Sequence, residues 1–395
     1  MSPANEQRFL KRILKIERFF RGHLFSIATH LSRSLLLRFI WLRRLGSSPA
    51  REAGVMVAAA FAIALMFAPV APAQNEQLSD LLHQGQAALQ AEDFNRAARV
   101  FEHAQQIGPN RKDVNRGLLL SYLQLGRLAD AESIAKAALT RWPNDPELLH
   151  WLGLVFFKQH QNDLAIPELQ RAVRLDPSQY DIHFDLALVL LSDDRYSEAA
   201  TELEVAVKLD PRAALPHVLL GRAYQNTNRS VQAVKQFQTA LRLEPALPLV
   251  HYHLGFAYES LGRNEEAIAE YEREVQRSPS NATALYQLGH CQLSAGLWKS
   301  AVEYLQKAAQ LEPGNSDAFY DLGKALLLEG DVQQAVPALR RSAELKPSNP
   351  TPHYQLSRAL ERLGRNEEAK QEMETFTTLN KAQPVTGGMA ASPIQ

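Results

Sequence analysis

The chain has 395 residues and no net formal charge, with 46% hydrophobic and 22% charged residues, proportions that are ordinary for a folded protein. The charge is uneven: residues 1–51 carry eleven basic and two acidic side chains, whereas the chain from Gln74 onward carries a net charge of −8, which disfavours a nucleic-acid partner. The single cysteine, Cys291, excludes an intramolecular disulfide and a metal site built from several cysteines, and is best interpreted as a small buried hydrophobe.

Residues 1–52 form a basic N-terminal segment in which arginines interrupt the apolar runs. Arg33, Arg38, Arg43 and Arg44 disfavour a bilayer span within it. One interpretation is a basic helix that lies on an anionic membrane surface. The other is that translation starts further along the chain, and the residues leave both interpretations open.

Residues 53–73 are predicted to be a signal peptide or a membrane anchor. Arg51 precedes the apolar run 55–68, and Ala71-Pro72-Ala73 supplies a small-residue cleavage site, so we expect cleavage after Ala73. A retained anchor is the alternative, because about 20 apolar residues can cross a bilayer. Since the positive charge stays in the cytoplasm, both interpretations predict an exported protein, periplasmic or secreted or anchored in an inner membrane, with any membrane contact made through residues 1–73.

From residue 78 to residue 383 the sequence repeats every 34 residues, with residue 78 as position 1 of the first of nine repeats. Each repeat predicts two short amphipathic helices, a tight turn such as Gly262–Asn264, and a closing proline. The closing prolines at position 32 are Pro109, Pro143, Pro177, Pro211, Pro245, Pro279, Pro313 and Pro347. Proline has no N–H and disfavours a helical residue before it, so it ends the second helix of each repeat.

Small residues keep the same step. Position 20 is alanine in all nine repeats, from Ala97 to Ala369. Position 8 is Gly85, Gly153, Ala187, Gly221, Gly255, Gly289 and Gly323, interrupted by Leu119 and Ser357. A small side chain at these places allows the two helices of a repeat to approach closely, and overfilling the contact would cost roughly 1–3 kcal/mol.

The pattern of Leu-Gly, Tyr, Ala, Phe/Tyr/Leu and Pro at these positions strongly resembles the tetratricopeptide repeat family over residues 78–383. The resemblance implies an all-α, right-handed superhelical solenoid of about nine helix–turn–helix repeats. In such a solenoid, stacking of neighbouring repeats buries the apolar faces that a single helix pair would leave exposed. The tail 384–395, rich in Pro and Gly, is predicted to be disordered.

Three local features carry expectations of their own. Asn162, Asn264 and Asn366, at position 17, are placed to cap the second helices. Glu274 replaces the usual alanine at position 27, and we expect its flexible stem to carry the carboxylate to the edge of the interface. The second helix of the ninth repeat is polar, as a terminal repeat facing water should be.

No catalytic constellation stands out: the sequence has no Gly-rich phosphate loop, no H-E-x-x-H, no G-x-S-x-G and no C-x-x-C, so we predict no enzymatic activity and no cofactor. The histidines at position 4 are the main alternative, as possible metal ligands. Those histidines are His183, His217, His251 and His353. Position 4 is a packing position in the resembled family, so packing is the preferred interpretation and no metal site is predicted.

The resemblance implies that positions 2, 5, 9 and 12 of the first helices face a concave groove. In the last four repeats position 5 is Tyr252, Tyr286, Tyr320 and Tyr354. Position 9 offers Arg222, Phe256, His290, Lys324 and Arg358 in the last five. In earlier repeats the groove positions are apolar, with Leu82, Leu120, Leu154, Phe157, Phe184 and Leu188. Tyr and Arg are enriched where proteins bind proteins, although tyrosine at position 5 is equally consistent with packing between helices.

Two functions follow as hypotheses. The first is a non-enzymatic scaffold or assembly factor, exported across a membrane, that binds a protein or peptide in its groove. The second is a membrane-tethered accessory subunit of a polysaccharide or secretion system that binds a glycan or recruits an enzyme, since tyrosine faces also stack on sugars. Two known binding modes of the family do not transfer. Positions 5 and 9 hold Tyr, Arg and Lys in place of the Lys and Asn of a carboxylate clamp, and position 6 lacks an asparagine ladder.

Overall fold

The computed structural model describes residues 70–382, and every regular element in that range is an α-helix. The first helices of the repeats are α4 (Val70–Gln90), α6 (Lys112–Gln124), α8 (Pro146–Lys158), α10 (Tyr180–Ser192), α12 (Ala214–Asn226), α14 (Val250–Glu259), α16 (Ala282–Ser294), α18 (Ser316–Glu329) and α20 (Thr351–Arg362). The second helices are α5 (Phe94–Ile107), α7 (Leu128–Arg141), α9 (Asn162–Leu175), α11 (Tyr196–Leu209), α13 (Ser230–Leu243), α15 (Asn264–Arg277), α17 (Trp298–Leu311), α19 (Val332–Leu345) and α21 (Asn366–Ala382).

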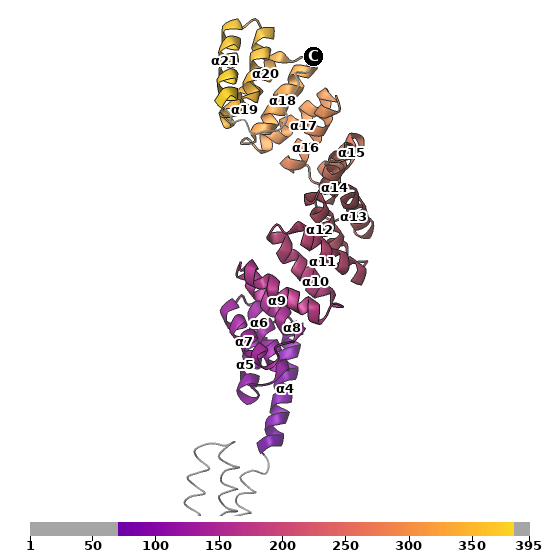
Figure 1. Ribbon diagram of the computed structural model, residues 1–395, viewed down its shortest axis with the longest axis vertical. Helices are drawn as coiled ribbons and strands as arrows, with labels where there is room; N and C mark the ends of the chain where they lie inside the picture. The colour runs from indigo at the N-terminus through magenta and orange to yellow at the C-terminus, as the bar shows by residue number, and fades with distance from the viewer. Residues whose placement is uncertain (1–69, 383–395) are drawn as a thin grey trace, which may run out of the picture. The chain divides into compact units, whose positions relative to one another are not determined.

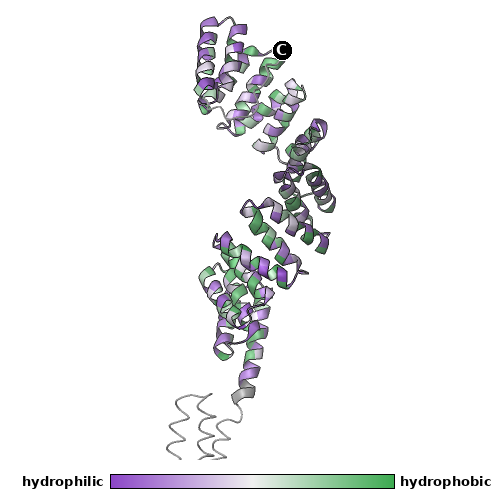
Figure 2. Cartoon of the chain, in the orientation of Figure 1, coloured by the Kyte–Doolittle hydropathy of each residue, from purple (hydrophilic) through white to green (hydrophobic). Residues whose placement is uncertain are grey.

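The repeat step predicted from the sequence is confirmed as an all-α solenoid. The chain divides after Gln84, and residues from Gly85 onward form one unit in which each helix packs against the next (Figure 1). All nine second helices begin at position 17, one step of 34 residues apart. Hydrophobic and hydrophilic residues both occur in these helices, as amphipathic packing requires (Figure 2).

The predicted 1–52 segment lies outside the described residues, as do most of segment 53–73 and the tail 384–395. Residues 70–73 form the first turn of α4. Among residues 70–382, none of the helices combines the length and the hydrophobicity that a membrane span requires.

The turn between the two helices of each repeat uses a left-handed residue at position 15. Five repeats place a glycine there, with φ between 70° and 101°: Gly126, Gly262, Gly296, Gly330 and Gly364. The other four use Glu92, His160, Asp194 and Asn228 at φ of 55–60°. Glycine adopts this conformation without a steric penalty, so the turn explains why the Gly262–Asn264 stretch was a reliable signal.

The close approach of the two helices is made by position 8 against position 24. A Cβ added to Gly221 would lie 2.6 Å from the Phe237 ring, and one added to Gly255 would lie 2.8 Å from the Tyr271 ring. Both values are too short for real carbon contacts. Position 8 is therefore small because the ring or leucine of the second helix occupies the space.

The second repeat satisfies the same contact with the sizes exchanged. Leu119 stands at position 8 and Ala135 at position 24, and both are fully buried. Gly117 lies against the Phe101 ring from the first repeat. The departure that makes this repeat look irregular in sequence is a swap that conserves volume across the helix pair.

The predicted asparagine caps are wrong by one residue. Asn162 and Asn264 are the first helical residues of α9 and α15, whose N-cap residues Gln161 and Arg263 make no side-chain cap. Asn366 is likewise the first residue of α21. A capping side chain must precede the helix, and Asp331 at position 16 meets this condition by accepting from the amide of Gln334 at 3.1 Å.

The expectation for Glu274 is also wrong: its side chain is buried, with 2% of the residue exposed. In the eighth repeat the Ser316 and Ser342 side chains touch, so position 27 lies against position 1. A glutamate at position 27 needs more room there than a serine or alanine. In this repeat α14 begins two residues late, at Val250, after Leu249 in the left-handed conformation.

The ninth repeat ends in the manner predicted for a terminal repeat. Helix α21 is extended to 17 residues, and Ala369 is its one buried residue. A polar outer face avoids an exposed apolar end.

The size exchange makes a testable prediction for Gly221→Leu and Phe237→Ala, which would reproduce the second repeat in the fifth. Alone, Gly221→Leu should cost roughly 1–3 kcal/mol by overpacking, and Phe237→Ala about 3–5 kcal/mol by leaving a cavity. The double variant should lose clearly less than the sum of the two. Urea unfolding of all four proteins measures this coupling, and strictly additive losses would show that the two positions do not share one space.

Candidate functional site

The predicted groove tyrosines join consecutive first helices. Tyr252, Tyr286 and Tyr320 are half-buried, and their hydroxyls approach position 6 of the next repeat. Those position 6 partners are Gln287, Asp321 and Gln355. Burial raises the pKa of all three hydroxyls. These tyrosines therefore serve largely as packing between repeats, and Tyr354 in the last repeat is the most exposed of the four at 36%.

The same link between position 5 and position 6 occurs in the N-terminal half with different chemistry. The Nε2 atom of His150 lies 2.7 Å from Oδ2 of Asp185, from the third repeat to the fourth. The link is thus a general feature of how first helices stack, and it is independent of tyrosine.

Three cationic side chains at position 9 are exposed and form no ion pair with a carboxylate of the described residues. They are Arg222, Lys324 and Arg358. Phe256, at the same position of the sixth repeat, is 42% exposed. Positions 5 and 9 are one helical turn apart and share a face, so the free cations and the ring lie along one row of first-helix positions.

His290, the remaining residue at position 9, connects three repeats. Its Nδ1 atom donates to Oδ2 of Asp321 at 2.7 Å, because a carboxylate can only accept. Its Nε2 atom lies 4.0 Å from Oε1 of Glu259, whose other oxygen accepts from the Tyr271 hydroxyl at 2.8 Å. The hydrogen bond that His290 donates to Asp321 raises the pKa of His290 despite partial burial, and the charge of Lys324 opposes the shift.

His253, which the sequence did not single out as a site residue, has a pKa that is shifted downward, opposite to that of His290. Its ring stacks on Phe237 with centroids 5.8 Å apart and meets Tyr252 edge-on at 5.3 Å. Burial, assisted by the positive charge of Arg222, lowers its pKa to about 4. The only sequence signal was its place at position 6, the position that contacts position 5 of the preceding repeat.

The histidines at position 4 bind the second helix of their own repeat, as the packing interpretation predicts. The Nδ1 atom of His183 lies 2.6 Å from Glu202, and that of His251 lies 2.7 Å from Glu270. His217 and His353 make the same contact, also 19 residues along the chain. Across residues 70–382, no three His, Cys, Asp or Glu side chains converge to hold a metal ion.

Family models decide the classification of this chain. A tetratricopeptide repeat model matches residues 82–146, 152–214, 218–282 and 286–350, and a second one matches residues 326–377. The chain belongs to the tetratricopeptide repeat family. A comparison with curated proteins finds no match.

Solved tetratricopeptide structures are similar at low identity. YrrB, a TPR protein with an unusual peptide-binding site, is 22% identical with a TM-score of 0.42, covering 47% of this chain and 95% of YrrB. MamA (41-end) from Desulfovibrio magneticus RS-1 is 20% identical with a TM-score of 0.42, covering 43% of this chain and 96% of that one. Cut9, from the APC/C complex Cut9–Hcn1, is 18% identical with a TM-score of 0.42, covering 72% of this chain and 56% of that one.

Among positions 2, 5, 9 and 12 of the tetratricopeptide repeats, the exposed large apolar side chains lie in the fifth, sixth and ninth repeats rather than toward the N-terminus. Leu120 and Phe184, from the predicted apolar part, are partly buried, as are Leu82, Leu154, Phe157 and Leu188. Leu215, Leu249 and Phe256 are 50%, 45% and 42% exposed at positions 2, 2 and 9. Leu249 immediately precedes α14 and has the left-handed conformation.

Cys291 behaves as the small buried hydrophobe that the sequence predicts. It is 1% exposed in the core of the middle repeats, and its Sγ atom faces the carbonyl of Asn264 at 3.7 Å. Burial raises its pKa to about 11, so the unreactive thiol form dominates at neutral pH.

The lowered pKa of His253 predicts acid sensitivity of the fold. The neutral ring is stabilised in the folded chain, so this stability is complete above pH 6.5 and is lost as the pH falls toward 4. Between pH 7 and pH 5 the loss from this residue should be on the order of 1–2 kcal/mol. Urea unfolding at pH 7 and pH 5 measures how much the free energy of unfolding falls between the two pH values. His253→Gln should reduce that fall by about this amount. An unchanged fall would contradict the lowered pKa of His253.

Proposed function

We propose that this chain is a non-enzymatic interaction scaffold or assembly factor that binds a protein or peptide partner along its first-helix positions 2, 5, 9 and 12. Membership of the tetratricopeptide repeat family supports this function at the coarse level. The observation that carries the finer proposal is the row of uncompensated cations at position 9: Arg222, Lys324 and Arg358.

These unpaired cations differ from other exposed arginines of the solenoid, which form ion pairs with nearby carboxylates. Exposed arginines such as Arg127, Arg195 and Arg365 bind carboxylates at 2.6–2.8 Å. Cations left without such a partner can accept acidic groups of a bound chain without breaking an internal ion pair. Together with exposed Phe256 and Leu215, they favour an extended partner segment that carries both acidic and apolar side chains.

The alternative, a polysaccharide-binding accessory subunit, has less support from the side chains. Sugar stacking needs exposed aromatic faces, whereas Tyr252, Tyr286 and Tyr320 are engaged between repeats. Phe256 and Tyr354 alone among the predicted aromatic residues are exposed. A protein or peptide partner therefore fits these positions better.

We further propose that the protein is exported, with residues 53–73 cleaved or retained as an anchor. The uncharged apolar run after Arg51 and the Ala71-Pro72-Ala73 site support this proposal. N-terminal sequencing of the protein purified from its own cells, with soluble and membrane fractions kept separate, tests it. A new terminus at Gln74 indicates a diffusible exported scaffold, a membrane form that retains 53–73 indicates an anchor, and a cytoplasmic form with an intact terminus contradicts export.

The partner-binding proposal predicts a specific loss on removing the three free cations. The variant Arg222→Ala, Lys324→Ala, Arg358→Ala should reduce recovery of the partner from native cells by at least about tenfold, because these residues have no structural ion pair to lose. Quantitative mass spectrometry of co-purified proteins measures the loss.

The matched control replaces three exposed cations of the second helices, Arg174, Lys208 and Lys307, by alanine. It changes the net charge equally and should leave co-purification unchanged. Equal loss in both variants would show a general charge effect and contradict the proposed surface.

A further inference from the structure

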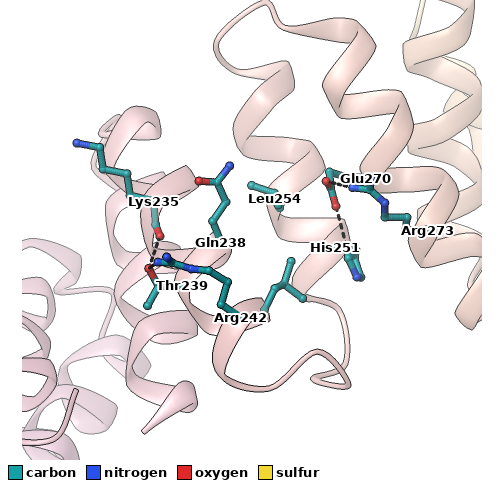
Figure 3. Close-up of a pocket in the computed structure, with 9 residues that line it drawn as sticks. Lys235, Gln238, Thr239, Arg242, His251, Leu254, Glu270 and Arg273 are labelled. Atoms are coloured by element: carbon teal, nitrogen blue, oxygen red, sulfur yellow. Dashed lines mark hydrogen bonds and ion pairs between the residues drawn. The ribbon is translucent and has the colours of Figure 1, made fainter. Parts of the chain in front are cut away.

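A recess opens on the second-helix side of the fifth and sixth repeats, away from the partner-binding positions. It has a volume of about 610 Å³ and is bounded by α13 on one side and by α14 and α15 on the other (Figure 3). It is lined by Lys235, Gln238, Thr239, Leu241, Arg242, His251, Leu254, Glu270 and Arg273. It lies beside the repeat whose first helix begins late.

Helix periodicity places three polar side chains of α13 along this recess. Lys235, Thr239 and Arg242 are separated by four and three residues and so share one face of the helix, as Figure 3 shows. The Arg242 guanidinium donates to the Thr239 hydroxyl at 2.9 Å, which in turn donates to the Lys235 carbonyl at 2.9 Å. Thr239 therefore positions the arginine.

The charge of the recess is positive. Its one carboxylate, Glu270, is 8% exposed and is occupied on both oxygens, by His251 at 2.7 Å and by Arg273. Lys235 and Arg242 are exposed and form no ion pair with a carboxylate within residues 74–382. Two cationic side chains thus remain uncompensated around a neutralised acid.

The recess also has an apolar floor. Leu254 is 2% exposed and Leu241 is partly buried, and both line the recess. Small-molecule sites in proteins have volumes of roughly 300–1,000 Å³ and combine an apolar lining with a few polar groups, and this recess meets that description.

We propose that this recess binds a small organic anion, with its oxyanion head against Arg242 and Lys235 and its apolar body over Leu241 and Leu254. The arginine and lysine donors suit a phosphate or a carboxylate head. The site occupies positions 22–29 of one second helix and positions 4, 7, 23 and 26 of the next repeat. None of these is a partner-binding position, so the site does not depend on the partner-binding proposal.

Titration calorimetry of the full chain tests the site with four probes: phenyl phosphate, phenylacetate, inorganic phosphate and neutral benzyl alcohol. We expect phenyl phosphate or phenylacetate to bind, and the stronger of the two identifies the preferred head. Inorganic phosphate should bind more weakly and benzyl alcohol not at all, because each lacks one of the two features. Absence of binding by both organic anions would overturn the proposal.

Variants locate the binding. Arg242→Gln and Lys235→Gln should each weaken the organic anion by at least about tenfold. Arg174→Gln is the matched control, since Arg174 is exposed at the same repeat position, 29, in the third repeat. Thermal unfolding checks that the variants are folded. Equal affinity in wild type, Arg242→Gln and Lys235→Gln would place the anion elsewhere and overturn the proposal.

Discussion

The structure depends on one steric constraint: the backbone of the first helix at position 8 packs directly on the side chain at position 24 of the second. Where position 24 is a ring or a leucine, position 8 holds only a very small residue: glycine at Gly221 and Gly255, and alanine opposite Leu203. The second repeat shows that the total volume, rather than the glycine, is what the contact requires. Because the contact lies in mid-helix, it holds the second helices in strict register while first-helix starts vary, as α14 shows.

The constraint also determines which side chains remain for binding. With one side of each first helix against its own partner helix, position 5 is left to contact position 6 of the next repeat. Tyr286 and His150 fill that place by different chemistry. At position 9, one turn further along, Arg222, Lys324 and Arg358 reach solvent, whereas His290 is held by Asp321 of the next repeat. A solenoid presents surface of this kind at every repeat, and its specificity comes from the side chains on it.

The fold could be predicted from the sequence because volume and backbone conformation restrict a few positions strongly. Alanine at position 20 and glycine or its substitutes at position 15 each answer a local requirement in all nine repeats, and proline at position 32 does so in eight. The asparagine caps were misplaced because a cap must precede the helix by one residue, a detail that the repeat step cannot supply. The burial of Glu274 could not be read from sequence, since the length of its side chain alone would allow the carboxylate to reach the edge of the interface.

The candidate site was less predictable for the same physical reason. Tyr252 and Arg222 look equally suited to binding as residue types, yet one packs between repeats and the other is free, and only the neighbouring repeat decides this. The role of His253 depends on stacking with Phe237 from the preceding repeat. Contacts between repeats, rather than patterns within one, determine which groove residues are available.

Site-specific photocrosslinking in native cells tests the central claim, that partners bind the first-helix row, most directly. A photoreactive residue is placed at Phe256, and in a parallel protein at Val231, an exposed apolar residue of the second helix α13. The account predicts that a distinct partner is crosslinked from position 256 and not from position 231. Crosslinking from position 231 alone would contradict it.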